Sequence, residues 1–214
     1  TLTFTTAEKS FFVDASRYGL VADGVTDNTA KLQAALSTCP AGGTVYLPAG
    51  TYRTQSLFLQ SNTALYLEKG CTLLGGTDRR DYPILPGVLP CHNEKDEQYL
   101  ALWEGNPLDS FAALINVINA ENVTITGEGT LDCNAQNGDW YQNPKQKRIA
   151  WRPRLFFTSG AKNVVLHGVL ACNSYSWTIH PTYSENIDIL NIRIRNSSQS
   201  PNTDGIDPES CKNV

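Results

Sequence analysis

The sequence of 214 residues contains no methionine, even at its start. No apolar run approaches the roughly 20 residues that a membrane-spanning helix needs. The opening TLTFTTAEKS also lacks the charged and apolar regions of a signal peptide. We therefore expect no membrane partner and predict a processed or excised piece of a longer reading frame. The predicted location is the cytoplasm or, where a signal has been removed, the periplasm or the cell exterior.

Cysteine pairs with metal-binding or redox spacing are also absent. The six cysteines form no C-x-x-C motif and no cluster with histidine, so we expect neither a metal site nor a cofactor. Because a chain of this size can build a sizeable core without bridges, most of the thiols are predicted to be small buried groups, with a disulfide as the less favoured alternative. They are Cys39, Cys71, Cys91, Cys133, Cys172 and Cys211.

Positive charge is scarce overall but concentrated in one segment. The net charge of −4 argues against nucleic acid as the main partner. The segment KQKRIAWRPR, however, contains Lys145, Lys147, Arg148, Arg152 and Arg154 with no acidic residue among them. It is interpreted either as a solvated basic loop or as an anion-binding patch suited to an acidic polymer.

An internal repeat is the main organising feature. Four segments share an asparagine near their start that is followed by a β-branched residue: ENVTITGEGTLDCN, KNVVLHGVLACN, ENIDILNIRIRN and CKNV. Their lead asparagines are Asn122, Asn163, Asn186 and Asn213. The intervals between them fit a repeat of roughly 23 to 27 residues with one insertion in the first interval, which contains the basic segment.

Within each repeat the apolar residues alternate, as expected of strands with one buried face. Matching inward positions are Val123 and Ile125, Val164 and Leu166, and Ile187 and Ile189. Each copy closes on an asparagine that could hydrogen-bond the backbone of a neighbouring turn, namely Asn134, Asn173 and Asn196. We therefore predict an all-β fold, a right-handed parallel β-helix that forms a single domain over residues 1–214.

A capping helix is predicted ahead of the repeats. The segment TDNTAKLQAALSTC offers Thr26 or Asp27 as its N-cap and places Leu32, Ala35 and Leu36 at helical spacing. Such a helix could cover the open end of the solenoid. The short apolar segments TVYLP, TYRT, LFL and ALYLEKGCTLLGG are expected to form the first turns.

Several motifs resemble one enzyme family. The opening YGLVADGVTDNTAKLQAAL with GGTVYLPAGTY is shared among several kinds of β-helix protein, but AWRPRLFF, SYSWTIHPTYSENI and SPNTDGIDPESCKNV follow it in order. Together they resemble the N-terminal part of the bacterial exo-acting polygalacturonases of glycoside hydrolase family 28. The resemblance implies hydrolysis of α-1,4-galacturonide links in pectin or oligogalacturonides with inversion, which requires an acid and a base about 6.5–9.5 Å apart.

The same resemblance implies site residues. The NTD motif assigns water activation to Asp204 and supporting roles to Asn202 and Asp207. Because His180 precedes Asp204 by about one turn of the repeat, His180 and Trp177 are candidate substrate contacts, with ordinary packing or turn roles as the alternative. Arginine forks match the carboxylate of each galacturonide ring, so the basic segment supplies further candidates. These are Lys147, Arg148, Arg152 and Arg154.

The sequence also departs from the family pattern. No Asp-Asp pair and no Gly-His-Gly follow the NTD motif before the last residue, Val214. The resemblance therefore implies that the general acid lies beyond Val214 and that this stretch alone is inactive. Two alternatives stay open: a non-catalytic, tailspike-like module that binds acidic polysaccharide, and a related rhamnogalacturonan or xylogalacturonan hydrolase.

Overall fold

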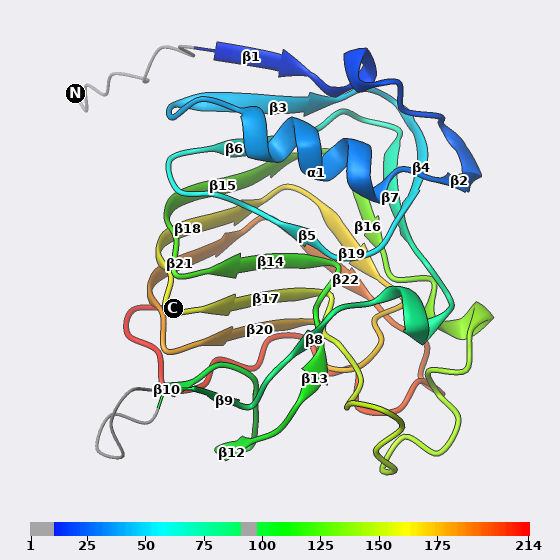
Figure 1. Cartoon of the computed structure of the whole chain (residues 1–214), viewed down its shortest axis with the longest axis vertical. Helices are drawn as coiled ribbons and strands as arrows, with labels where there is room; N and C mark the ends of the chain where they lie inside the picture. The colour runs from blue at the N-terminus through cyan, green and yellow to red at the C-terminus, as the bar shows by residue number, and fades with distance from the viewer. Residues whose placement is uncertain (1–10, 91–97) are drawn as a thin grey trace.

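Three sheets of parallel strands surround the main core in the computed structural model, which describes residues 11–90 and 98–214 (Figure 1). Sheet A contains β1 (Phe11–Asp14), β3 (Gly43–Leu47), β6 (Ala64–Leu67), β15 (Glu121–Gly127), β18 (Lys162–His167) and β21 (Glu185–Leu190). Sheet B contains β2 (Asp23–Asp27), β4 (Gly50–Thr54), β7 (Cys71–Gly75), β16 (Thr130–Asp132), β19 (Leu170–Cys172) and β22 (Arg193–Arg195). Sheet C contains β5 (Leu57–Phe58), β14 (Ile115–Ile118), β17 (Phe156–Ser159) and β20 (Ile179–Thr182). From β3 onward the chain visits A, B and C in that order on each turn, so the predicted parallel β-helix is confirmed.

The repeat register stacks identical positions, as the sequence predicts. Val123 pairs with Val164, and Val164 pairs with Ile187. All three side chains are almost fully buried in the core, as are Ile125 and Leu166. Apolar burial of about 25 cal/mol per Å² along these inward rows is the main force holding the turns together.

The lead asparagines form a ladder along one corner of the solenoid. The side-chain amide of each donates to the side-chain oxygen of the asparagine one turn earlier, at 2.8 to 3.0 Å. The backbone at each rung has a positive φ between 53° and 60°, a conformation that asparagine tolerates better than most residues. The ladder consists of Asn62, Asn122, Asn163, Asn186 and Asn213.

The closing asparagines bind neighbouring turns in three different ways. Asn134 donates to the backbone oxygen of Gly75 at 3.2 Å, and Asn196 accepts the backbone N–H of Ser174 at 2.9 Å. Both contacts match the prediction. Asn173 instead donates to a side chain, the carboxylate of Asp132, at 2.9 Å.

Helix α1 (Thr29–Thr38) covers the first edge of sheet C, where the first turn has no strand (Figure 1). The Gln33 side chain accepts a hydrogen bond from the N–H of Phe58 at 2.9 Å and donates one to the Phe58 carbonyl at 3.0 Å. It thereby satisfies backbone groups at the edge of β5 that no neighbouring strand pairs. The predicted cap is confirmed, but its N-cap is Asn28 rather than Thr26 or Asp27. The Asp27 carboxylate still accepts the N–H of Thr29 at 2.8 Å.

Two insertions interrupt the turns. The described residues of the first, between β7 and β14, form the 3-10 helix η2 (Arg79–Asp81) and three antiparallel strand pairs. The pairs are β8 (Ile84–Leu85) with β13 (Ser110–Phe111), β9 (Val88–Leu89) with β10 (Gln98–Tyr99), and β11 (Leu102–Trp103) with β12 (Asn106–Pro107). The second, between β16 and β17, contains η3 (Ala135–Asn137) and the basic segment, whereas η1 (Ala15–Tyr18) precedes β2. The first insertion, which the repeat does not predict, covers the outer face of sheet C through Leu85, Ala101 and Phe157.

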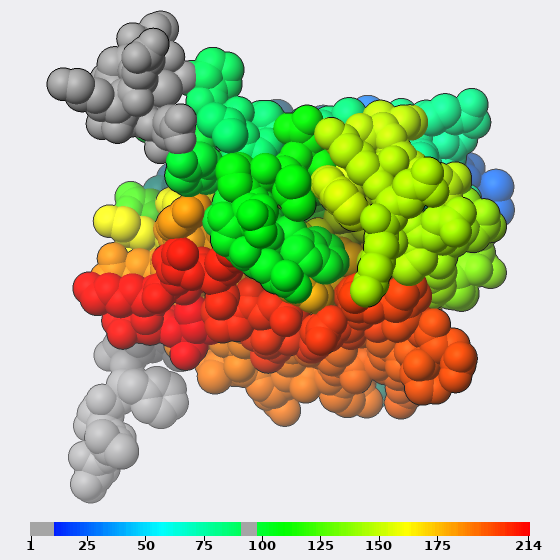
Figure 2. Space-filling view, turned by 90° about the horizontal axis from the view of Figure 1, so that it is seen from below, coloured from blue at the N-terminus to red at the C-terminus, as the bar shows by residue number. Residues whose placement is uncertain are grey.

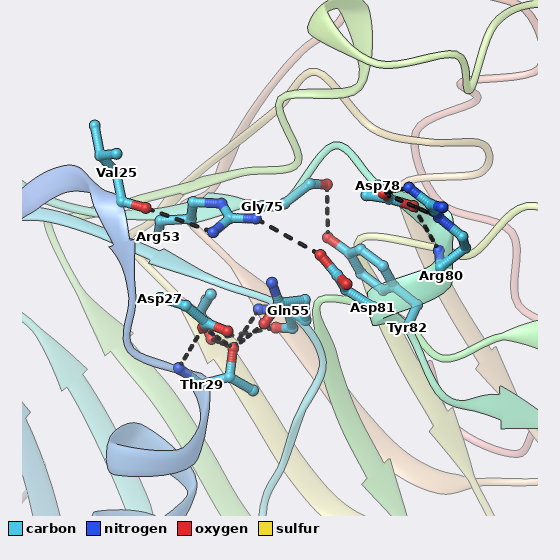
Figure 3. Close-up of polar contacts among 12 residues, drawn as sticks. Val25, Asp27, Thr29, Arg53, Gln55, Gly75, Asp78, Arg80, Asp81 and Tyr82 are labelled. Carbon is cyan, nitrogen blue, oxygen red and sulfur yellow. Dashed lines mark hydrogen bonds and ion pairs between the residues drawn. The ribbon is translucent and has the colours of Figure 1, made fainter.

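The root of the first insertion is fastened to the solenoid by polar contacts (Figure 3). Arg53 of β4 pairs with Asp81 of η2 at 3.7 Å, and the Tyr82 hydroxyl donates to the carbonyl of Gly76 at 2.9 Å. Tyr82 also contacts the hydroxyl of Tyr175, which lies in the turn before β20. The insertion is therefore anchored close to the segment that leads into the last turns.

The cysteines placed by the structure are free thiols. Cys39, Cys71, Cys133 and Cys172 are buried and Cys211 is partly exposed, while Cys91 lies outside the described residues. Burial raises the pKa of the Cys71 and Cys172 thiols to about 12. Across residues 11–90 and 98–214, no helix has the length and apolar character needed to cross a bilayer.

Candidate active site

The NTD segment forms the last described layer of sheet C. Ile206 bridges Ile179, and Glu209 bridges Thr182. This register places Asp207 opposite His180 and Asp204 opposite Trp177. His180 and Asp204 therefore lie in adjacent layers, as the sequence predicts, but the residue that directly faces His180 is Asp207.

Asp207 and Asp204 lie in different environments. Asp207 is half-buried, and its Oδ2 atom has no hydrogen-bond partner within the described part of the chain. Burial, reinforced by repulsion from Asp204 and opposed by Arg154, raises the pKa of Asp207 to about 6. Asp204 is exposed to solvent. The NTD segment therefore presents one exposed carboxylate and one half-buried carboxyl three residues apart.

Arg152 holds the turn that carries Asn202. Its guanidinium donates to the Asn202 side-chain oxygen at 2.7 Å and to the carbonyls of Pro201 and Tyr175 at 2.8 Å each. Only 6% of Arg152 is exposed, and burial lowers its pKa to about 10. Asn202 is exposed and adopts a left-handed backbone with φ of 55°. The structure thus gives Arg152 a direct role in shaping the turn before Asp204.

Arg154 is buried beneath the same layer. It donates to His180 Nδ1 at 3.2 Å, to the carbonyl of Arg152 at 2.8 Å and to the carbonyl of Leu102 at 3.0 Å. Burial lowers its pKa to about 9. Because Arg152 and Arg154 are both committed to internal acceptors, neither presents the exposed fork that the sequence led us to expect.

His180 is fully buried and neutral. Burial, with the nearby charge of Arg154, lowers its pKa to about 2. Its Nε2 atom lies 3.0 Å from Glu209 Oε2, a distance typical of an ion pair, but a neutral imidazole makes this a hydrogen bond to a carboxylate. Sequence reasoning missed Glu209, although in an extended segment residues two positions apart, such as Asp207 and Glu209, point to the same face.

Trp177 stacks on a second tryptophan. The rings of Trp177 and Trp103 lie 4.4 Å apart at 21°, and the Arg154 guanidinium lies 4.6 Å from Trp103 and 5.2 Å from Trp177. Trp177 is only partly exposed, so much of its surface serves packing. Trp103 belongs to the first insertion, whose sequence does not follow the repeat. The spacing of the repeat therefore gave no indication that Trp103 lies at the site.

Folding brings acidic partners to part of the basic segment. Arg148 pairs with Asp139, which also binds the buried Arg79, and Lys147 lies 3.5 Å from Asp109. These acids lie outside the basic segment and reach it only through folding. Lys145 remains exposed beside the site.

A pocket of about 290 Å³ lies between the two insertions next to Asn202. In Figure 2 the first insertion (green) and the second (yellow-green) lie side by side, and the final segment (red) runs along them. The pocket offers two indole rings, one ammonium group and one carboxylate, a mixed lining suited to a charged sugar ring. Its lining residues are Trp103, Glu104, Leu108, Pro144, Lys145, Trp151 and Asn202. Within residues 11–90 and 98–214, no group of three His, Cys, Asp or Glu side chains could hold a metal ion.

Comparison with known proteins agrees with this geometry. Residues 100–214 match the model of the glycosyl hydrolases family 28, and residues 12–75 match that of the rhamnogalacturonase A/epimerase, pectate lyase-like family. A protein of Vitis vinifera named "Probable polygalacturonase" is 34% identical over 92% of this chain and 39% of its own length.

Two solved structures extend the comparison. The family 28 exopolygalacturonase of Yersinia enterocolitica superposes with a TM-score of 0.80 at 24% identity, covering 97% of this chain and 42% of that one. The hyperthermoactive exopolygalacturonase of Thermotoga maritima gives 0.75 at 29% identity, covering 94% and 50%. The chain therefore spans half or less of the length of these three proteins. The matched family model covers more than half of the 214 residues and includes every candidate site residue, so the chain belongs to the glycosyl hydrolases family 28.

Proposed function

We propose that the protein hydrolyses α-1,4-galacturonide links in pectin or oligogalacturonides, with inversion and from a chain end. The observation that carries the proposal is the last described layer of sheet C, which holds an exposed carboxylate, Asp204, and a carboxyl of raised pKa, Asp207. The similarity to the exopolygalacturonase of Thermotoga maritima supports the substrate and the exo mode.

Asp204 is the proposed water-activating base. Its side chain is exposed to solvent, so a water molecule can reach it. Arg152 and Asn202 fix the turn that presents Asp204. Asp207, three residues further on, has the proposed supporting role. Lys145 is the proposed counter-ion for a substrate carboxylate, since its ammonium group is exposed at the pocket.

The test is product analysis on three polymers: polygalacturonate, rhamnogalacturonan and xylogalacturonan. We expect monogalacturonate as the first product from polygalacturonate, released as the β-anomer and detected by proton NMR before mutarotation. Release of longer oligomers would overturn the exo mode, and retention of the α-anomer would overturn inversion. Binding to polygalacturonate without any product would favour the non-catalytic module instead.

The location is proposed to be the periplasm or the cell exterior, where a polymeric substrate is met. Fractionation of cells that express the native reading frame tests it. Recovery only in the cytoplasmic fraction would contradict this and would favour short oligogalacturonides as the substrate.

A further inference from the structure

The hairpin of β11 and β12 is held against the site at two points. Arg154 donates to the carbonyl of Leu102 at 3.0 Å, at the start of the hairpin. At its tip, the N–H of Gly105 donates to Glu209 Oε1. Glu104 and Gly105 both have positive φ, as in the tight turns of two-residue hairpins.

A fixed chain of donors and acceptors joins the two points. Arg154 can only donate, so His180 Nδ1 must accept and must carry no proton. The neutral ring therefore carries its proton on Nε2 and needs an acceptor there, which Glu209 Oε2 supplies. The other oxygen of Glu209 accepts the N–H of Gly105. Only a carboxylate can accept at both positions, because a glutamine amide presents donors on one side.

The segment between the two points carries Trp103. Its ring stacks on Trp177 and lies under the Arg154 guanidinium. Trp103 also lines the pocket beside Asn202, so the position of the hairpin sets one wall of that pocket.

We propose that Glu209 is a positioning residue that fixes this hairpin and thereby the Trp103 wall of the sugar-binding pocket. The proposal rests on the proposed function for its effect on substrate, but the effect on the hairpin does not depend on it. Glu209 lies two residues after Asp207, so one segment carries both a site carboxyl and the anchor of the pocket wall.

The test compares Glu209→Gln with the native protein and with Glu185→Gln, a control that removes a carboxylate paired with Lys212 at the surface. The first readout is near-ultraviolet circular dichroism, which detects the coupling between stacked indoles. We expect Glu209→Gln to reduce the Trp103–Trp177 signal and Glu185→Gln to preserve it. An unchanged signal in Glu209→Gln would overturn the proposal, whether or not the protein hydrolyses galacturonides.

The second readout is steady-state kinetics on trigalacturonate. Loss of a hydrogen bond to a charged group predicts a KM raised about tenfold with kcat changed less than threefold. A fall in kcat at constant KM would overturn the positioning role, since Glu209 would then act on the reaction itself. If the native protein shows no hydrolysis, the proposed function fails while the dichroism still decides on the hairpin.

A second variant guards against misfolding of Glu209→Gln. Trp103→Phe leaves the Glu209 carboxylate and its two donors in place but removes the indole wall. It should reproduce the rise in KM. A Trp103→Phe enzyme with native KM would contradict the proposed wall.

Discussion

The asparagine corner of the solenoid and the outer face of sheet C are built on opposite rules. At the corner, each turn from Asn62 onward repeats the same residue and the same backbone conformation, and the same side-chain hydrogen bond joins each asparagine to the next. In sheet C, successive layers carry Phe157, His180 and Asp207 at matching positions, and the first insertion packs against this sheet through Phe157. The repeated residues hold the turns in register, and the residues that do not repeat form the candidate site.

The largest effect is expected for Asp204→Asn, which changes the outer face of sheet C and nothing at the corner. Removing a general base predicts a fall in kcat of about 10²–10⁴-fold, with no change in melting temperature. Reducing-sugar release from polygalacturonate measures it. Asp188→Asn, an exposed aspartate on β21, is the matched control and should retain native kcat. Equal activity in both variants would contradict the role of Asp204.

Arg152→Met comes next, because it keeps the buried stem and removes the groups that hold the Asn202 turn. Misplacing a catalytic group by about 1 Å predicts a loss of roughly 10–100-fold in kcat/KM. Arg193→Met, at an exposed position on β22, should have no effect. Native kcat/KM in Arg152→Met would show that the turn keeps its shape without the arginine.

At the corner, Asn163→Ala should lower the free energy of unfolding without changing KM, in contrast to the site variants, which change activity. It removes two ladder hydrogen bonds and places alanine at φ of 53°, for a cost of about 2 kcal/mol. Urea unfolding measures the loss. Asn119→Ala shares the left-handed backbone, with φ of 49°, but lies outside the ladder, so it isolates the backbone contribution. Equal losses in the two variants would mean that the ladder bonds add nothing.

The pH dependence of stability should also distinguish the two regions. The folded pKa of Asp207, about 6, lies above its unfolded value of about 3.9, so the native state binds the proton more tightly. The contribution of Asp207 to stability is therefore present below pH 4 and is lost as pH rises through 6. Calorimetry on the native protein and on Asp207→Asn should show that the variant lacks this loss. Parallel curves for the two proteins would contradict the raised pKa.

The smallest effect is expected for Lys145→Ala at the pocket rim. An exposed charge pair contributes about 0.2–1 kcal/mol, so KM for trigalacturonate should rise roughly two- to fourfold and the difference should shrink in high salt. Lys69→Ala, an exposed lysine far along the sequence on the loop after β6, is the control. A salt-independent difference would exclude a charge effect.

Prediction from sequence succeeded where the chain is periodic. The inward rows, the capping helix and the lead asparagines were all visible as spacings, because each depends on local alternation or on a fixed repeat. Candidate site residues in the NTD motif were identified by resemblance, and their catalytic roles stay predictions.

The environment of the site residues was not predictable in the same way. Asp109 and Asp139 neutralise parts of the basic segment from positions that precede it in the chain, and Trp103 of the first insertion reaches Trp177 in a later turn. Such contacts depend on how two aperiodic insertions fold over the solenoid, and no local pattern encodes them. The burial of Arg152 and Arg154 has the same origin.

The asparagine corner also has a consequence for how such a chain tolerates change in length. Each rung uses one donor and one acceptor, so a further turn adds a bond identical to the last, and removing an internal turn lets its neighbours join without loss. The ladder thus fits the rise between turns and does not depend on how many turns there are. Inserting or deleting a whole turn leaves the remaining ladder hydrogen bonds intact, whereas a small shift of register inside one turn would break two of them at once.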